Sequence, residues 1–466
     1  MMVTAEEARL HEDLVAQLRA LSLAQQPQRT AAEVRRLLDR LPNRAVAEAF
    51  LSLDDQDLAS LLAQLTDDIV AELIAELAPA EGARLLLRLS RARAAHVLDE
   101  MAPDDAADLM AAVGRVSRQA EEDILVEMQP REAGDVRDLL AYPEESAGGI
   151  MTTRVATVRP DMTAEQALAA VRRLAAEERA ETIYYLYVTD EQRRLLGVLS
   201  LRELVLAPPK AAIGDIMRRE FAAVRPETDQ EAVARLLTEK HLLALPVVDG
   251  QGRLLGIVTT DDVADVLVEE TTEDIYRLAG VYAEEEHALS PLARSLRARV
   301  PWLMLNLLTA FLAASVVAPF EGTISRAAAL AVFMPVIAGH GGNTGTQVAT
   351  IVVRSLALGT VTLRDVWRIV RKEVAFGLVH GALAGLLCAA FALLLDANPW
   401  LALVVVVAMI GNVVVAGLVG SLIPLALQRL GQDPALASAI WLTTFTDMFG
   451  FLILLGSGTL LVQRLA

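Results

Sequence analysis

The sequence predicts a multidomain chain with three parts: a cytoplasmic all-α superhelical domain, a pair of small α/β units, and an α-helical membrane domain of five transmembrane helices. Charge is the first observation behind this prediction. From Val300 onward 8 Lys and Arg stand against 6 Asp and Glu, which leaves 34 basic and 54 acidic residues before Val300. The second observation is a repeat of short motifs between residues 150 and 260, and the third is a series of long apolar runs after residue 299.

The acidic balance of the first 299 residues bounds their partners. An excess of negative charge disfavours nucleic acid as a partner and favours divalent cations or simple solubility. The only cysteine, Cys388, excludes an intramolecular disulfide. Charged residues interrupt the first 20 positions, so we expect no signal peptide and an acidic part that stays in the cytoplasm.

Residues 1–140 are predicted to form the acidic helical domain. We expect an amphipathic helix over residues 5–22 and then, over residues 30–140, successive helices of about twelve residues. Pro79 and Pro103 open two of these helices, because proline is tolerated in the first helical turn. Stacked short helices predict a small superhelical domain.

Two copies of one motif set follow the helical domain. Ile150-Met151 recurs as Ile216-Met217 at an offset of 66, and residues 196–200 recur as residues 255–259 at an offset of 59. Each copy predicts a strand, a helix, two strands joined by a turn, and a closing helix.

This pattern resembles a tandem pair of CBS modules, here at residues 141–207 and 208–270. The resemblance implies that an adenine nucleotide, with ATP as the candidate, binds between the modules; which nucleotide binds is left open. In that family a hydroxyl followed three residues later by a carboxylate can hold the ribose, as Ser200 and Glu203 would here. The implied nucleotide-binding set is Tyr185, Ser200, Arg202 and Glu203, with Thr259 and Asp262 at the matching positions of the second copy.

Five apolar segments are long enough to cross about 30 Å of hydrocarbon at about 1.5 Å per residue. They are residues 300–320, 327–353, 374–395, 397–428 and 434–463. Basic residues cluster before the first segment and between the second and third. The positive-inside rule therefore predicts a multi-pass protein of the cell (inner) membrane, with its N-terminus in the cytoplasm and its C-terminus outside.

Asp447 is the most informative residue of the membrane part, because residues 434–463 carry no other charge. A carboxylate at that depth costs roughly 2.5–3.5 kcal/mol on insertion scales, so it is expected to face the bundle interior and to meet a cation or water. The sequence therefore predicts a route for a cation across the membrane.

The second predicted span contains four glycines between residues 339 and 345, which we expect to loosen the helix and to allow close backbone approach. Asn343 and Gln347 are four residues apart and share a helical face. An interface of small residues with amides bonding across it is the alternative to a pore. The predicted pore residues are Asp447, Asn343, Gln347, Gly342 and Gly345.

Other intramembrane polar residues have two interpretations. His340 and His380 are either ligands or proton carriers, or hydrogen-bonded structural groups, and the structural interpretation is the commoner one. The structural interpretation also applies to Asn412.

Acidic residues form clusters in the cytoplasmic part. Asp104 and Asp108 are one helical turn apart, and Asp262, Asp265, Glu269 and Glu273 fall on one predicted stripe. Like charges so spaced repel by a few tenths of a kcal/mol per pair. The stripe is either a solvated face or a surface that a divalent ion neutralises.

The whole order of parts resembles the MgtE family of magnesium channels. The resemblance rests on the Gly-Gly-Asn-Thr-Gly-Thr-Gln run at 341–347, on Asp433-Pro434 and on Thr446-Asp447. It implies a homodimer whose pore carries hydrated Mg²⁺ past Asp447, and Mg²⁺ sensing in the cytoplasm. The chain has His241 where the family has an acidic sensor residue. The sensor residues implied are Glu72, Asp104, Asp108, Asp229, Glu231, Asp262, Asp265, Glu270, Glu273 and Asp274.

The predicted mechanism is a Mg²⁺-selective uptake channel that cytoplasmic Mg²⁺ closes. A connecting plug helix is expected within residues 271–298, ahead of a membrane domain at 299–466. One alternative is an H⁺- or Na⁺-coupled divalent cation transporter that uses His340 or His380 with Asp447. Another is a membrane-anchored nucleotide sensor. No enzyme is expected, because the sequence has no Ser/His/Asp set, no P-loop and no Cys/His metal spacing.

Overall fold

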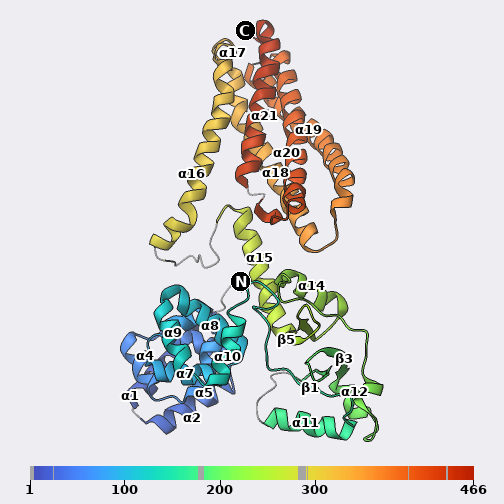
Figure 1. The fold of residues 1–466 in the computed structure, drawn as a ribbon. Coiled ribbons are helices and arrows are strands. Elements are labelled where there is room, and N and C mark those ends of the chain that lie inside the picture. The colour runs from blue at the N-terminus through green and yellow to red at the C-terminus, as the bar shows by residue number, and fades with distance from the viewer. Residues whose placement is uncertain are drawn as a thin grey trace. The chain divides into compact units, whose positions relative to one another are not determined.

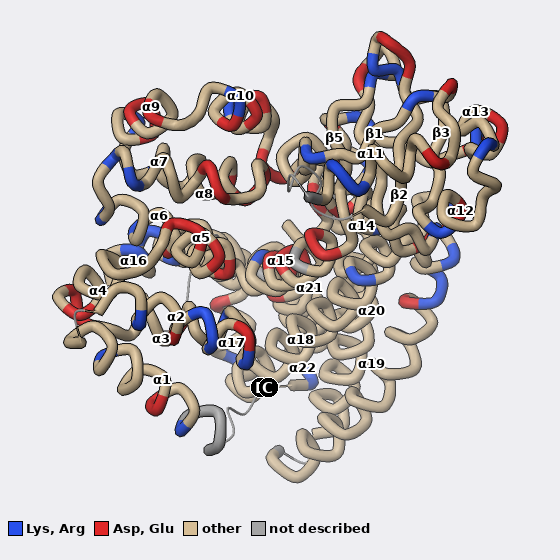
Figure 2. Tube along the Cα trace, turned by 90° about the horizontal axis from the view of Figure 1, so that it is seen from below, with Lys and Arg blue, Asp and Glu red and all other residues tan. Residues whose placement is uncertain are grey.

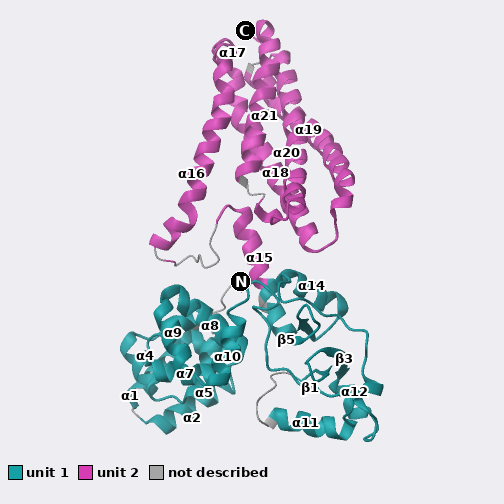
Figure 3. Cartoon of the chain, viewed as in Figure 1, with its two compact units in different colours: residues 1–267 teal, residues 268–466 magenta. Residues whose placement is uncertain are grey.

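The computed structural model of the chain describes residues 5–24, 26–176, 183–281, 290, 292–396, 398–436 and 439–465. It divides into two compact units, residues 1–267 and residues 268–466 (Figures 1 and 3). The border between the units falls within one helix, α15, which runs from Thr260 to Leu278.

The first unit begins with ten helices, as the sequence predicts for an all-helical part. Pro79, Pro103 and Pro130 each stand at the first position of a helix, where a missing N–H leaves no hydrogen bond unmade. Alternate helices pack together: α5 on α7, α7 on α9, α6 on α8 and α8 on α10. The helices are α1 Ala5–Ala24, α2 Pro27–Leu38, α3 Asn43–Leu51, α4 Asp55–Leu62, α5 Asp67–Ala75, α6 Pro79–Leu86, α7 Arg91–Glu100, α8 Pro103–Val116, α9 Arg118–Glu127 and α10 Pro130–Leu139.

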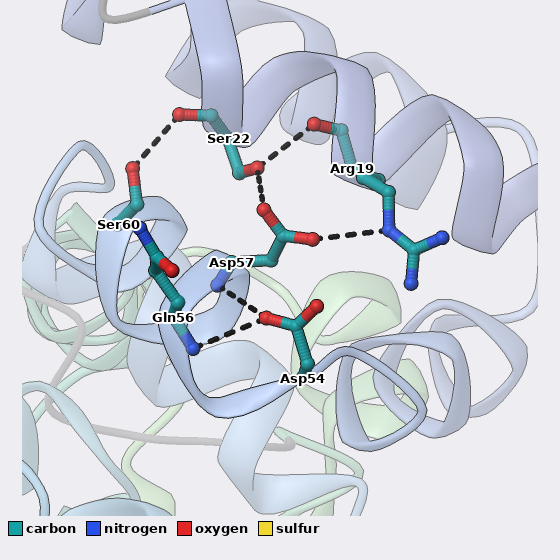
Figure 4. Close-up of polar contacts among 6 residues, drawn as sticks. All are labelled: Arg19, Ser22, Asp54, Gln56, Asp57 and Ser60. Carbon is teal, nitrogen blue, oxygen red and sulfur yellow. Dashed lines mark hydrogen bonds and ion pairs between the residues drawn. The ribbon is translucent and has the colours of Figure 1, made fainter.

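A polar cluster attaches α1 to α4 (Figure 4). The Ser22 hydroxyl donates to Asp57 Oδ1 at 2.7 Å, and Arg19 Nε donates to Asp57 Oδ2 at 3.0 Å. Asp54 accepts from the Asp57 backbone N–H and so caps α4, while the Ser60 hydroxyl donates to the Ser22 carbonyl. The hydrogen bond from the Ser22 hydroxyl does most to lower the pKa of Asp57; partial burial opposes this effect, and Arg19 adds to it.

Two small sheets follow, one for each sequence copy. Strands β2 and β3 pair antiparallel, with β1 parallel to β2, and β4 and β5 pair antiparallel. The bounds are β1 Thr157–Val158, α11 Ala164–Ala176, β2 Tyr185–Thr189, β3 Leu195–Ser200, α12 Leu201–Leu206, α13 Ile213–Ile216, α14 Gln230–Lys240, β4 Ala244–Val248 and β5 Leu254–Thr259. The copies therefore have the predicted element order, although the first strand of the second copy is reduced to one bridge, between Val224 and Val247.

The two copies are not separate along the chain. Thr152, just after the first Ile-Met pair, exchanges backbone hydrogen bonds with Ile257 of β5, whereas Arg218, just after the second pair, does so with Val198 of β3. Each Ile-Met segment thus joins the sheet of the other copy. The sequence repeat did not indicate this exchange, because a repeat does not specify which copy a segment pairs with.

The second unit contains long apolar helices with few charges (Figure 2). Helix α20 packs against α18, α19 and α21. Leu330, Phe333, Val405 and Leu454 lie in the buried core of the bundle. The bounds are α16 Leu292–Val317, η1 Ala318–Phe320, α17 Glu321–Arg326, α18 Ala329–Ala357, η2 Leu363–Asp365, α19 Val366–Asp396, α20 Pro399–Arg429, η3 Pro434–Leu436, α21 Ala439–Leu460 and α22 Val462–Leu465.

Within the described residues, four segments are long and apolar enough to cross a membrane: Leu292–Arg326, Leu363–Leu395, Pro399–Arg429 and Ile440–Leu460. The second predicted span, residues 327–353, corresponds to α18, which is not among the four. Its 29 residues would reach about 43 Å, but the Gly, His, Asn, Thr and Gln side chains of its middle reduce its hydropathy.

Two predicted features of the backbone are wrong. The glycine-rich run is not loosened, since α18 is a continuous helix from Ala329 to Ala357. A single plug helix within 271–298 is also not formed, because α15 ends at Leu278. Gly280 has φ +72°, and hydrogen bonds from Gly280 and Val281 back to the last turn close the helix. Residues 282–289 and 291 of the expected plug lie outside the described residues.

Glycines also set the approach of α19 to α20. A Cβ added at Gly377 would lie 2.9 Å from Val414 Cα, and one added at Gly381 would lie 2.7 Å from Ile410 Cα. Gly385 continues the same four-residue spacing along α19. This is the small-residue pattern that lets membrane helices pack backbone to backbone.

Candidate functional site

Asp447 lies on the face of α21 that also carries Thr443 and Gly450, four residues before it and three after it. The side chain is half-buried, whereas Trp441 and Phe445 are exposed on another side of the helix. Among the described residues, no hydrogen-bonding or charged group acts on its carboxyl.

The glycine-rich run of α18 packs beside the turn of α21 that precedes Asp447. A Cβ at Gly342 would lie 3.2 Å from Thr443 Cγ2, and one at Gly345 would lie 3.7 Å from Leu442 Cβ. Both glycines are buried. They therefore set the spacing between α18 and α21 at the level of the acid.

Asn343 and Gln347 lie on a different side of α18 from these two glycines. Both amides are exposed and, as predicted, share one face of the helix. The five predicted pore residues thus divide into two groups: glycines packed on α21 beside Asp447, and amides on the open side of α18.

Asn412 joins the helices that carry these residues. It is 0% exposed, and its Nδ2 donates to the Ile337 carbonyl of α18 at 2.7 Å. A Cβ at Gly341 of α18 or at Gly450 of α21 would lie 2.2 Å or 3.0 Å from the Asn412 amide. This geometry agrees with the prediction that Asn412 is a hydrogen-bonded structural group. Within the described chain its Oδ1 has no hydrogen-bond partner.

His340 of α18 and His380 of α19 lie in contact. Their Nε2 atoms are 3.0 Å apart, and the rings stack with centroids 5.0 Å apart. Both side chains are half-buried. The sequence singled out each histidine but gave no sign that the two pair, because 40 residues separate them.

A charged cluster forms where the end of α15 meets η3 within the second unit. Arg277 forms ion pairs with Glu273, four residues earlier, and with Asp433. Burial, together with the charges of Asp433 and Glu270, raises the pKa of Asp274 to about 6. Asp274 therefore lies close to Asp433, which the sequence marked only as a family motif, and Glu273 shares the Arg277 guanidinium with Asp433.

Arg277 was missed by sequence reasoning. Its spacing of four residues from Glu273 is typical of a helical ion pair and could have indicated that contact. Its approach to Asp433, 156 residues away, has no local signal.

Three other predicted sensor residues lie among the N-terminal helices. Glu72 is held by an ion pair with Arg35 and by the Asn43 amide at 3.2 Å. Asp104 is buried and Asp108 exposed, one turn apart in α8. The structure therefore confirms the predicted spacing of the α8 pair, while Glu72 is engaged within its own helices.

The remaining sensor residues belong to the second copy. Asp229 caps α14 by accepting from the Glu231 N–H at 2.9 Å, and Asp262 accepts from the Thr259 hydroxyl at 2.6 Å. The side chain of Asp265 lies outside the described residues. Across the described parts of the chain, no three His, Cys, Asp or Glu side chains gather closely enough to hold a metal ion. The described members of the predicted sensor set thus form no such cluster within one chain.

Three of the four predicted nucleotide-binding residues are adjacent. Tyr185 and Ser200 are directly opposite on β2 and β3, and Ser200 forms a reciprocal capping box with Glu203. Arg218 pairs with Glu203 at 2.5 Å. Partial burial raises the pKa of Glu203, but hydrogen bonds from Ser200 and Arg218 outweigh this effect, so the pKa is lowered overall. Arg202 is exposed on the first turn of α12.

Three family patterns match the chain. Residues 334–457 match the family MgtE, described as a divalent cation transporter. Residues 41–145 match the MgtE intracellular N domain, and residues 147–210 and 213–269 match the CBS domain.

Curated relatives are similar over most of their length. The magnesium transporter MgtE of Thermus thermophilus is 42% identical over 366 residues, which are 77% of this chain and 80% of that protein. The proteins of the same name from Enterococcus faecalis and Bacillus subtilis are 39% and 34% identical, over 69% and 73% of this chain and 70% and 75% of their own.

Solved structures similar to the chain include the soluble part of a magnesium transporter, at 31% identity and a TM-score of 0.40 over 53% of this chain and 99% of that one. Another is the cytosolic domain of the Mg²⁺ channel MgtE in complex with ATP, at 39% identity and a TM-score of 0.38 over 51% of this chain and 99% of that one.

Proposed function

The chain belongs to the MgtE family of magnesium transporters, since curated members are 34–42% identical to it over 70–80% of their own length, and from this membership we propose that it is a Mg²⁺-selective channel for magnesium uptake. It is a multi-pass membrane protein. Transport rather than catalysis is its proposed role.

The placement of Asp447 carries this proposal. An acid in an apolar helix is retained where it meets a cation or water. Asp447 is half-buried on α21, just after the turn that packs against Gly342 and Gly345, and among the described residues no hydrogen bond or ion pair engages it, which would leave it available to an ion. Mg²⁺ sheds its water reluctantly, which favours outer-shell contact with carboxylate, amide and carbonyl oxygens.

The proposed pore is formed by a homodimer in the lipid bilayer. The amides of Asn343 and Gln347 lie on an exposed side of α18 and would face a second copy of the chain there. In this arrangement α18 also crosses the cell (inner) membrane, which brings the number of spans to five. The N-terminus is then cytoplasmic and the C-terminus is outside. Two facing Asp447 carboxylates would favour a divalent over a monovalent cation.

Cytoplasmic Mg²⁺ is proposed to close this pore. The cluster at the end of α15 supports the proposal, because burial and like charge already disfavour the ionised form of Asp274, and a divalent ion would relieve that repulsion. The other proposed sensor positions are Glu72, Asp104, Asp108, Asp229, Glu231, Asp262, Asp265, Glu270 and Glu273. Cytosolic Mg²⁺ sensing needs millimolar affinity, about −4 kcal/mol per ion, so several sites are required for a sharp response.

A nucleotide, with ATP as the candidate, is proposed to bias the same equilibrium from the CBS pair. The match to the CBS domain and the juxtaposition of Tyr185, Ser200 and Glu203 support this site. Arg202 is exposed two residues after Ser200, the first residue of the capping box, and is the proposed phosphate contact.

The test is Mg²⁺ flux into liposomes that contain the full-length chain, with a panel of divalent cations. We expect Asp447→Asn to reduce Mg²⁺ flux at least about tenfold, because removal of a charge that stabilises the ion is worth 1.4 kcal/mol or more. Glu321→Gln, on the exposed short helix α17, is the matched control and should leave flux unchanged. Normal flux and ion preference in Asp447→Asn would rule out the proposed pore.

A second candidate is an H⁺- or Na⁺-coupled divalent cation transporter. The contact between His340 and His380 favours it, because an imidazole pair can accept and release a proton. Mg²⁺ flux that follows an imposed pH or Na⁺ gradient at a fixed Mg²⁺ gradient would select coupled transport, and flux indifferent to both would select the channel.

A further inference from the structure

The contact between His340 and His380 brings two possible metal ligands together in the membrane part. The two side chains come from different helices, α18 and α19, and their Nε2 atoms face each other at 3.0 Å. Phe376 stacks on the His380 ring, with centroids 5.3 Å apart, and so restricts the rotation of that ring. The His380 ring is therefore held by stacking contacts with both His340 and Phe376.

The separation of the two nitrogens is close to that of two ligands on one ion. Zn²⁺ binds imidazole nitrogen at about 2.0–2.1 Å, so two nitrogens at a tetrahedral angle lie roughly 3.3 Å apart. The His340 and His380 nitrogens are within about 0.3 Å of that separation, and an ion would replace the hydrogen bond between them once both lone pairs turn toward it.

The chemistry of the pair excludes Mg²⁺ as its ion. Mg²⁺ selects oxygen ligands, whereas neutral imidazole suits Zn²⁺, Ni²⁺ and Cu²⁺. Both histidines are half-buried, so part of each side chain lies at the surface of the helix bundle of one chain.

We propose that His340 and His380 form a two-imidazole binding site for a transition-metal dication such as Zn²⁺ or Ni²⁺, which joins α18 to α19. Water supplies the other ligands. The binding is independent of the proposed transport function. Its consequence for transport rests on that function: Asn343 and Gln347 lie one and two turns beyond His340 on α18, so a metal that fixes α18 against α19 should inhibit Mg²⁺ flux.

The first experiment measures metal binding to the full-length chain in detergent, purified without a histidine tag. We expect one saturable Zn²⁺ or Ni²⁺ site per chain, and a melting temperature that rises with metal concentration because the metal binds the folded state. His340→Ala and His380→Ala should each weaken this binding at least about tenfold, since loss of an outer-shell partner alone costs about 10–100-fold. His96→Ala, at a histidine whose side chain is 66% exposed on α7, is the matched control and should change nothing.

Two further variants separate a lost ligand from a misfolded bundle. His380→Gln keeps a side chain that can hydrogen-bond to His340 but removes the metal ligand, so it should fold and lose the site. His380→Cys should restore binding with a preference shifted toward Zn²⁺ and Cd²⁺, because thiolate is a softer ligand. Cys388→Ser should retain the site, which would show that the native thiol is not one of its ligands.

A full-length chain that binds no Zn²⁺ or Ni²⁺, or that binds it equally well in His380→Gln, overturns the proposal. Because binding and melting are measured without flux, a chain that proved unable to conduct Mg²⁺ would leave this outcome unaffected. In liposomes, low concentrations of Zn²⁺ should inhibit Mg²⁺ flux through the wild-type chain and not through His380→Gln.

Discussion

At the scale of single residues, glycines decide how closely the helices of the membrane part approach. A Cβ at Gly341 would lie 2.2 Å from the Asn412 amide, and one at Gly420 of α20 would lie 2.6 Å from the Gly345 carbonyl oxygen. Gly339, only two residues before Gly341, has nothing within 4 Å. Neighbouring glycines of one helix therefore differ in whether the surrounding structure leaves room for a side chain.

This difference predicts opposite outcomes for two alanine substitutions in α18. Gly341→Ala should destabilise the bundle by about 1–3 kcal/mol, the usual cost of overpacking, because Asn412 is fully buried and cannot move aside freely. Gly339→Ala should be neutral or slightly stabilising, because alanine favours helix. Labelling of Cys388, the only cysteine, with a thiol-reactive dye during heating measures both. Equal melting temperatures would contradict the described packing.

Arg277 gives a second prediction at this scale. Its guanidinium pairs with Glu273 and Asp433 and so supplies part of the positive charge that an ion would otherwise bring. Arg277→Gln should therefore let cytoplasmic Mg²⁺ inhibit flux at a concentration lower by a factor of about five, if the pairs are worth about 1 kcal/mol.

The control for Arg277→Gln is Arg44→Gln, which removes an exposed pair with Glu48 on α3. Inhibition by Mg²⁺ is measured in liposomes for both. An unchanged or higher inhibitory concentration in Arg277→Gln would mean that Arg277 does not compete with Mg²⁺.

The sequence could identify single residues but not their partners. Asp447 was recognisable because it is the only charge in its segment, and its half-buried position follows from the cost of exposing it to lipid. The contacts of His340 with His380 and of Arg277 with Asp433 depend on tertiary packing, and no periodicity or local spacing encodes them. Whether the predicted pore and sensor residues bind ions stays a prediction.

At the scale of elements, the short helices of the N-terminal part depend on local polar contacts as well as on apolar packing. Asp57 holds α1 through Ser22 and Arg19, and these contacts keep its pKa below the usual value of 3.8. A carboxyl with a lowered pKa contributes stability above its unfolded pKa, and that stability is lost as pH falls through the folded pKa.

Asp57→Asn should therefore lower the melting temperature of the chain at pH 7. The difference in melting temperature between this variant and wild type should become smaller as the pH falls below about 4. Asp55→Asn is the control, because that carboxyl is 88% exposed in its pair with Arg88. Melting followed by circular dichroism across this pH range is the measurement. A difference between Asp57→Asn and wild type that grows on acidification would contradict the assigned contacts.

Element boundaries were predictable where the residue at the boundary acts locally. Pro79 and Pro103 open helices because proline needs no hydrogen bond there, and both starts are confirmed. Gly280 is an equally local signal for the end of a helix, but the predicted plug helix was drawn through it. The continuity of α18 through its glycines was not local, because packing on α20 and α21 stabilises a helix that the glycines alone would weaken.

At the scale of the whole molecule, the proposed sensor resides in the part that precedes the spans. Deletion of residues 1–270 should leave Mg²⁺ flux that cytoplasmic Mg²⁺ no longer inhibits, because most proposed sensor acids are removed. Flux is measured in liposomes with Mg²⁺ varied on the cytoplasmic side. Preserved inhibition would refute the sensor proposal. Asp447→Asn in the shortened chain should reduce flux at least about tenfold, as in the full-length chain, which would confirm that the ion still takes the same route.

The exchange of Ile-Met segments has a mechanical consequence. Since Thr152 is bonded to Ile257 and Arg218 to Val198, neither α/β copy can move away from the other without breaking these backbone hydrogen bonds. The two copies must therefore move together as one rigid body. In the proposed mechanism, a nucleotide or an ion bound by either copy would therefore change the orientation of both copies together.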